Sequence, residues 1–167
     1  MIRLIEDNDT FEAIKLMRKY TINNGDFFGF EYNEAAWMRY FLDIVEQQKT
    51  NPHYLAVGDF TEDNIVGFLT ATSYVNHYDN RYIMDVKDCI VNLENKNNAF
   101  IVYRLFDSMI EHTKKHGGKH WRADSARGES DSFKYGELLK RRYNAEVSAS
   151  IRGVIGCLLY TSPSPRD

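Results

Sequence analysis

The strongest constraint on the fold lies in the second half of the chain, where strand and helix patterns alternate. Tyr82–Val91 predicts a strand, although charged residues interrupt its alternation. After a polar stretch, Ala99–His116 repeats apolar residues at helical spacing until Gly117 and Gly118 end the pattern. His120–Asp124 predicts another short strand. A strand, a helix and a second strand in this order predict a right-handed βαβ unit.

The first half of the chain predicts a strand, two helices and two further strands. The first helix begins at Asp9, whose spacing to Glu12 fits a capping box, and the second begins at Asn33. The second helix presents Trp37, Phe41, Ile44 and Gln48 on one side, and the apolar part of this side predicts a core-facing stripe. The strands cover Met1–Glu6, His53–Asp59 and Ile65–Tyr74, the last two forming a hairpin.

The chain ends with a predicted helix at Asp131–Arg142 and a predicted strand at Glu146–Val154. The order β-α-α-β-β-β-α-β-α-β predicts one α/β domain over residues 1–155. Residues 156–167 change to a Ser/Pro-rich composition without periodicity, and residues 157–167 resemble a translated sequencing-library adapter. We expect this tail to lie outside the fold, either as a non-native addition that truncates the natural chain or as a disordered tail.

Composition narrows the class of protein. The 167 residues carry a formal net charge of −3, so no global positive field recruits nucleic acid or an anionic membrane. The sequence contains neither an apolar run near the roughly 20 residues that span a bilayer nor the apolar core of a signal peptide. Cys89 and Cys157 are too few for a disulfide framework or a zinc site. These features predict a cytoplasmic protein.

Three local features accompany this element order. Ile65–Leu69 is an apolar strand segment that follows a polar hairpin turn. Val91–Ile101 falls in register with the motif V-x-P-E-x-R-x-x-G-x-G, where Val91 and Glu94 agree and Lys96 replaces Arg or Gln. Asp131–Tyr143 is similar to the motif N-x-x-A-x-x-L-Y-x-K-x-G-F, in which Lys140 matches. With these features and its element order, the chain resembles the GNAT superfamily of acyl-CoA N-acyltransferases, whose third strand Ile65–Leu69 would form.

The resemblance implies that acetyl-CoA is the co-substrate, with no metal. A backbone amide near Ile90 or Val91 would polarise the thioester carbonyl, and the amides at the following helix start would bind the pyrophosphate. Ala99 and Ile101 replace the glycines of the motif, so Ile101 is expected to narrow the phosphate site. The implied binding residues are Ile90, Val91, Lys96, Asn97, Asn98, Ala99, Phe100, Ile101 and Asp131. The alternative is an Asn-capped helix with a solvated lysine.

The resemblance also implies catalytic groups that act on a small-molecule or protein amine. Asp88 and Asp85 are the candidate bases, each with the alternative of a solvated or salt-bridged carboxylate. The usual thiolate-protonating tyrosine would fall at Leu138, so Tyr135 is the candidate substitute, or else packs on its helix. Four aromatic residues, Phe27, Phe28, Phe30 and Tyr32, either shape the acceptor site or form a small core of their own.

Two other classes of function stay open from the sequence. The altered glycines and the missing tyrosine are compatible with a binding protein without catalysis. Basic runs near Lys114 and Lys140 are compatible with nucleic-acid binding, although cations also suit the C-terminal ends of helices. His112 and His116 share one helix face but lack further ligands in a metal-binding motif, so we predict no metal site.

Overall fold

A computed structural model describes residues 1–24, 33–62, 64–78, 80–92, 94, 97–123 and 129–145. For residues 22–24 and 129–135 it describes the backbone alone. The order of the described elements agrees with the sequence prediction from the first strand to the last predicted helix. The predicted final strand at Glu146–Val154 and the tail at 156–167 lie outside the described residues.

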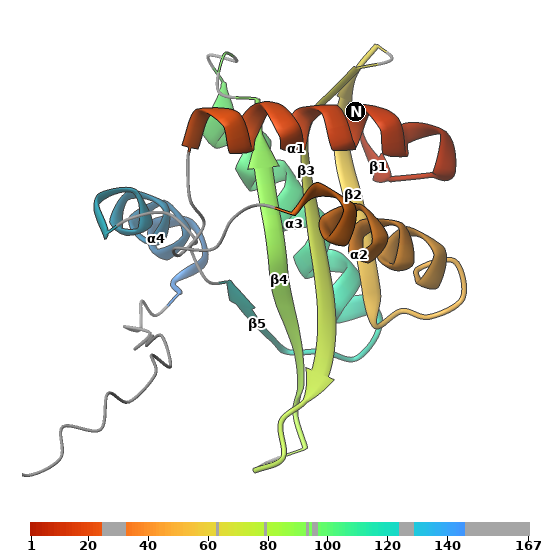
Figure 1. The fold of residues 1–167 in the computed structure, drawn as a ribbon. Coiled ribbons are helices and arrows are strands. Elements are labelled where there is room, and N and C mark those ends of the chain that lie inside the picture. Colours follow the sequence, from red (N-terminus) through yellow and green to blue (C-terminus); the bar gives the residue numbers. More distant parts are fainter. Residues whose placement is uncertain are drawn as a thin grey trace, which may run out of the picture.

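A mixed sheet forms the centre of the fold (Figure 1). Its five described strands lie side by side in chain order, β1-β2-β3-β4-β5, and all neighbouring pairs are antiparallel except β4 and β5, which are parallel. The strands are β1 (Ile2–Leu4), β2 (Tyr54–Thr61), β3 (Asn64–Val75), β4 (Tyr82–Val91) and β5 (His120–Ala123). The parallel pair with a helix between its strands confirms the predicted βαβ unit.

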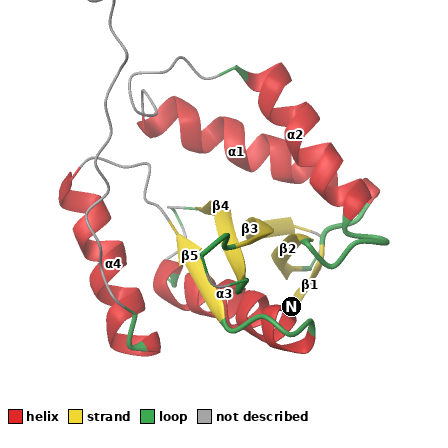
Figure 2. Ribbon diagram, turned by 90° about the horizontal axis from the view of Figure 1, so that it is seen from below, coloured by secondary structure: helices red, strands yellow, loops and turns green. Residues whose placement is uncertain are grey.

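Helices cover both faces of the sheet. Figure 2 shows α1 and α2 over one face and α3 against the other, with α4 beside the β5 edge. The helices are α1 (Thr10–Asn24), α2 (Glu34–Gln47), α3 (Asn98–Lys115) and α4 (Glu129–Tyr143). This arrangement confirms the predicted α/β fold class. Among the described residues, no helix is long and apolar enough to cross a membrane.

The start of α1 differs from the prediction. Asp9 does not cap α1 but ends the short 3-10 helix η1 (Asp7–Asp9), and its side chain accepts a hydrogen bond from the Glu6 amide at 2.9 Å. Arg3 donates two further hydrogen bonds to the Asp9 carboxylate, at 2.6 and 2.8 Å. The capping box is therefore shifted by three residues, to Glu6 and Asp9. This pairing lowers the pKa of Asp9.

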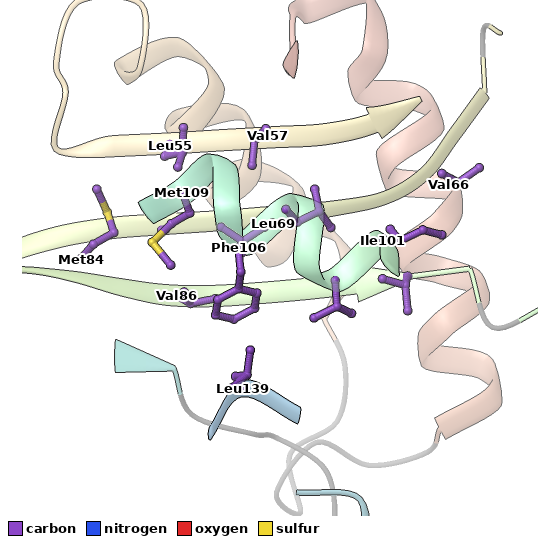
Figure 3. Close-up of a cluster of buried hydrophobic side chains, with 14 residues drawn as sticks. Leu55, Val57, Val66, Leu69, Met84, Val86, Ile101, Phe106, Met109 and Leu139 are labelled. Atoms are coloured by element: carbon purple, nitrogen blue, oxygen red, sulfur yellow. The ribbon is translucent and has the colours of Figure 1, made fainter. Parts of the chain in front are cut away.

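Each face of the sheet has its own apolar core. Phe41 and Ile44 of α2 pack with Phe68 of β3 on the face covered by α1 and α2. On the opposite face, α3 packs against β2, β3 and β4, and Leu139 of α4 extends this core past Phe106 (Figure 3). The two cores hold the central strands from both sides, so their positions are closely fixed.

The contact between β3 and the first turn of α3 leaves no room for a side chain at Gly67. A Cβ atom there would lie 2.6 Å from Cγ2 of Ile101 and 3.1 Å from the carbonyl oxygen of Ile90. Ile101 is 1% exposed, and its β-branched side chain has little rotamer freedom. Gly67 therefore determines how closely the start of α3 approaches the sheet.

Replacing Gly67 with alanine should lower the free energy of unfolding by about 1–3 kcal/mol, because the added methyl group overpacks this contact. Urea denaturation measures the loss. In an Ile101→Ala background the same substitution should cost much less, since Cγ2 is gone. Equal costs in the two backgrounds would show that Ile101 does not cause the restriction.

Candidate functional site

A β-bulge interrupts the pairing of β3 with β4. Ala71 pairs with Val86, whereas its neighbour Thr70 pairs with Asp88 rather than with Lys87. Lys87 is thus an extra residue on β4. Bulges of this kind re-aim side chains and are frequent beside active sites.

The bulge brings both candidate bases to one face of the sheet. Residues three apart on a regular strand point to opposite faces, but one inserted residue restores the same orientation to Asp85 and Asp88. The packing agrees, because Val86 belongs to the core under α3 and Ile90 to the core under α1 and α2. Asp85 and Asp88 therefore both face the side of α1 and α2.

Asp85 is engaged in ion pairs. Its Oδ2 lies 2.5 Å from Nζ of Lys87, and its Oδ1 lies 4.0 Å from Nε of Arg122 on β5. These contacts match the salt-bridged alternative that the sequence left open.

Asp88 has a different environment. Its Oδ2 accepts a hydrogen bond of 2.8 Å from the hydroxyl of Thr70, a residue with no exposed surface. Burial among protein atoms raises the pKa of Asp88, although Thr70, Trp37 and the charge of Lys87 each act to lower it. A carboxyl group with a raised pKa is better matched to accept a proton near neutral pH. Of the two candidates, Asp88 suits the role of base.

Two residues of α2, Trp37 and Tyr40, lie beside this carboxylate. The sequence pattern assigned Trp37 to the core and did not single out Tyr40. The indole N–H of Trp37 acts as a donor toward Asp88 and lowers its pKa, and the charge of Asp88 helps to raise the pKa of Tyr40, after the larger effect of burial. The helical stripe did predict that Trp37 faces the sheet. It gave no indication of a polar role, because an indole ring fits an apolar stripe equally well.

The second half of β4 has an open edge. The Asn92 amide donates to the Val66 carbonyl oxygen at 2.9 Å, so by antiparallel alternation the Ile90 amide also faces β3. The amide of Val91 then points the other way. On that side β5 pairs with β4 along Ile83–Val86, and no described strand pairs with the rest of β4. The sequence left Ile90 and Val91 as alternatives, and the geometry favours Val91.

The start of α3 follows directly after this edge. The carbonyl oxygen of Asn97 accepts the amides of Phe100 and Ile101, at 3.0 and 3.2 Å. The amides of Asn98 and Ala99 precede these bonds and belong to the first helical turn, whose N–H groups point out of the helix end. This end carries the positive pole of the helix dipole and suits an anion.

Ile101 does not narrow this helix end, contrary to the sequence prediction. Its side chain lies in the core beneath α3, against Gly67, as Figure 3 shows for the labelled side chain. The prediction was wrong because the first turn of α3 directs this position toward β3 and not toward the loop. Phe100 points outward and is 67% exposed.

Several predicted site residues cannot be placed. Phe27, Phe28, Phe30, Tyr32 and Lys96 lie outside the described residues. The backbone of α4 includes Asp131 and Tyr135, whose side chains are also outside the description. Glu94, which matches the motif, forms an ion pair of 2.7 Å with Lys19 of α1.

The histidine pair and the basic run of α4, which suggested a metal site and nucleic-acid binding, form contacts within the protein. His112 Nε2 lies 2.9 Å from the carbonyl oxygen of Pro52, and no group of three or more potential ligands gathers anywhere in the described part. In the basic run at the end of α4, Arg142 pairs with Asp107 at 2.6 Å and Lys140 lies 4.0 Å from Glu137. These pairs agree with a structural role for much of the basic charge.

Neither a protein-family model nor a curated protein matches the sequence. Solved structures, however, match it over almost its whole length. A ribosomal-protein-alanine N-acetyltransferase from Brucella melitensis is 16% identical, with a TM-score of 0.66 over 93% of this chain and 99% of that chain. An aminoglycoside N-acetyltransferase in complex with CoA is 12% identical, with a TM-score of 0.70 over 94% and 95%.

A third similar structure is the glucosamine-6-phosphate N-acetyltransferase from Arabidopsis thaliana. It is 13% identical, with a TM-score of 0.64 over 93% of this chain and 98% of that chain. At these identities the matches show the fold alone. The chain has the GNAT-like fold that the resemblance implied.

The Asp88 carboxyl should titrate above the ordinary aspartate value of about 3.9, because burial disfavours its charged form. Replacing Thr70 with valine should raise this pKa further, since the hydrogen bond that favours the ionised form is lost. Carboxyl-carbon NMR titration measures both values. Thr113→Val is the control, because that buried hydroxyl donates to Met109 on the far face. A measured pKa of Asp88 at the ordinary aspartate value would contradict this prediction.

Proposed function

We propose that the chain is an acyl-CoA-dependent N-acyltransferase that transfers an acetyl group from acetyl-CoA to an amine. One observation carries this proposal: the open half of β4 combines an outward-pointing amide at Val91 with a half-buried carboxylate of raised pKa at Asp88, and the start of α3 follows immediately. Oxyanion donor, proton acceptor and anion site are the three groups that such a transfer uses.

The described residues fit acetyl-CoA in kind. The amides at the first turn of α3 suit the pyrophosphate. The side chain of Ile101 does not cover them, because it lies in the core. The unpaired edge of β4 suits the extended, amide-bearing arm of the cofactor, which pairs as a strand would. Acetyl-CoA supplies an activated acyl group as its thioester. Lys96, Asn97 and Asp131 remain proposed contacts by resemblance.

Each residue then has a defined task. The Val91 amide donates a hydrogen bond to the thioester oxygen and so stabilises the charge that develops there. The amine nitrogen forms a bond to the thioester carbon as the carbon–sulfur bond breaks, and Asp88 accepts the proton that the nitrogen loses. The thiolate leaves on CoA and takes a proton from Tyr135 or from water. Atoms and charge balance without any further reactant.

The acceptor belongs to the same proposal. Three of the similar structures are named for an alanine of a ribosomal protein, an aminoglycoside and glucosamine 6-phosphate. These amines differ widely, so the fold itself selects none of them. An alanine-terminated peptide, sisomicin and glucosamine 6-phosphate make a suitable first panel. The aromatic residues at positions 27–32 are proposed to line the acceptor side, and a cytoplasmic location stays a prediction.

Replacing Lys96 with glutamate should weaken acetyl-CoA binding at least tenfold, about 1.4 kcal/mol, because a negative charge then faces the pyrophosphate. Isothermal titration calorimetry measures the dissociation constant. Lys114→Glu at the opposite end of α3 changes the net charge equally and should leave the affinity unchanged. Failure of the unaltered protein to bind acetyl-CoA at millimolar concentration would overturn the proposal, and salt-dependent nucleic-acid binding would be tested next.

Replacing Asp88 with asparagine should reduce acyl transfer by about 10²–10⁴-fold while acetyl-CoA still binds, because the proton acceptor is lost. Release of CoA in the presence of each amine of the panel measures the rate. Asp43→Asn removes an exposed carboxylate from α2 and serves as the control. Binding of acetyl-CoA by the unaltered protein without transfer to any amine would favour a binding protein over an enzyme.

A further inference from the structure

The first half of α2 is held firmly against the sheet, where the helix contacts β2 and β3. The Asn33 side chain caps the helix by accepting the Ala36 amide at 3.0 Å, and Glu34 forms two hydrogen bonds with Arg18 of α1, at 2.9 and 2.6 Å. A helix fixed at its start presents the following side chains in defined directions. Trp37 and Tyr40 come one and two turns after this cap and face the sheet.

Aromatic packing fixes the ring of Trp37. It stacks on Phe41 with ring centroids 4.9 Å apart and an interplanar angle of 19°, and its centroid lies 6.0 Å from that of Phe68. Phe41 in turn meets Phe68 edge to face at 5.5 Å. Because these two phenylalanines are fully buried, the indole has little freedom to turn. Its N–H group keeps a constant direction.

The polar atoms of both α2 residues are buried without well-formed hydrogen bonds. Trp37 Nε1 and Tyr40 Oη reach no described partner in good hydrogen-bond geometry, although each lies close enough to a polar group to act on it, Trp37 on Asp88 and Tyr40 on Thr70. Buried polar groups are nearly always paired, so two such atoms beside one carboxylate require an explanation. Trp37 acts on Asp88, and Tyr40 acts on Thr70, whose hydroxyl donates to Asp88. Both atoms therefore border the proposed proton acceptor.

We propose that Trp37 and Tyr40 are positioning residues that hold the Asp88 carboxylate toward the acceptor amine, which makes the first half of α2 part of the acceptor site. This inference rests on the proposed acyltransferase function. On this proposal the indole N–H and the phenolic hydroxyl complete their hydrogen bonds when the amine, with its attendant water, binds at Asp88.

The hydrogen-bonding capacity of the group supports this arrangement. A carboxylate accepts about four hydrogen bonds, and Asp88 uses one of them for Thr70. The indole N–H can only donate, so it supports the carboxylate and cannot compete with it for the amine proton. The tyrosine hydroxyl can donate to Thr70 and still accept from an amine N–H.

The other ionisable groups around Asp88 do not replace these donors. Lys87 favours the charged carboxylate but forms its close ion pair with Asp85 on the same strand. Tyr54 of β2 adjoins Tyr40, and Tyr20 of α1 packs in the same core. Of these groups, only Lys87 acts on the pKa of Asp88 beside the contributions of Thr70 and Trp37. Loss of a donor from α2 should therefore make Asp88 harder to ionise.

The test compares Trp37→Phe and Tyr40→Phe, which keep an aromatic ring and delete the polar atom. Carboxyl-carbon NMR titration of the protein alone gives the pKa of Asp88. The pH dependence of kcat/KM, with acetyl-CoA and the best amine of the panel, gives the acid limb of the reaction. Tyr82→Phe is the control, because that hydroxyl donates to the Pro52 carbonyl and its ring belongs to the opposite core.

We expect the pKa of Asp88 to rise by roughly half to one pH unit in Trp37→Phe and by a smaller amount in Tyr40→Phe, which acts through Thr70, with the acid limb displaced by the same amount in each variant. The affinity for acetyl-CoA should not change, and Tyr82→Phe should behave as the unaltered protein does. An unshifted pKa and acid limb in Tyr40→Phe and in a folded Trp37→Phe would overturn the inference. Should Trp37→Phe fail to fold, Tyr40→Phe decides alone.

Failure of the proposed function is distinguishable from failure of this inference. A shifted Asp88 pKa in the two variants, together with no acyl transfer by the unaltered protein, would reject the enzyme and retain the electrostatic link between α2 and Asp88. Acyl transfer with an unmoved pKa would retain the enzyme and reject the positioning role.

Discussion

The pairing of β4 with its two neighbours changes along its length, and the candidate site depends on that change. On one side β4 follows β3 from end to end, with one extra residue at Lys87. On the other side it pairs with β5 only through Val86, so within the described residues its second half keeps an unpaired row of backbone groups. The bulge and the end of the β5 pairing fall at neighbouring residues. The bulge therefore changes the facing of Asp88 at the point where the backbone groups of β4 lose their strand partner.

An exposed strand edge is ordinarily a liability, and two dense cores restrain this one. Ile90 and Val91 are both buried, one under α1 and α2 and the other under α3. Farther along the sheet, the fully buried Asp59 of β2 forms ion pairs with Arg104 of α3 and with the terminal ammonium of Met1. A buried carboxylate needs such partners, since its desolvation is costly. These contacts tie α3 to the sheet along its length.

The sequence predicted the elements well, because apolar periodicity and caps are local properties. Tyr82–Val91 and the Asn33 cap agree with the structure residue by residue. Orientation was harder to predict. Asp85 and Asp88 looked equivalent as bases, and only the bulge pairing and the ion pairs of Asp85 separate them. Neither feature has a signature in the strand itself. The orientation of the two carboxylates therefore depends on tertiary contacts that the strand sequence does not reveal.

The same limit explains two other differences. Ile101 stands where the resembled motif has a glycine. Its burial against Gly67 depends on the angle at which α3 meets β3. The proposed polar role of Trp37 depends on the direction of its indole N–H, whereas periodicity reports only which face of the helix is apolar. Local patterns thus pointed to a candidate site on β4 but could not predict which side chains lie around it.

The chain order of the strands also bears on how the molecule folds. β2, β3 and β4 are joined by hairpins, so the central pairs form between segments that are close in sequence and incur a small loss of chain entropy. β1 and β5 pair only after longer intervening segments have been brought in, α1 and α2 in one case and α3 in the other. A three-stranded meander is therefore the natural nucleus. Asp88 and Val91 lie on its outer strand, so the open edge of β4 would exist early and become enclosed as the helices dock.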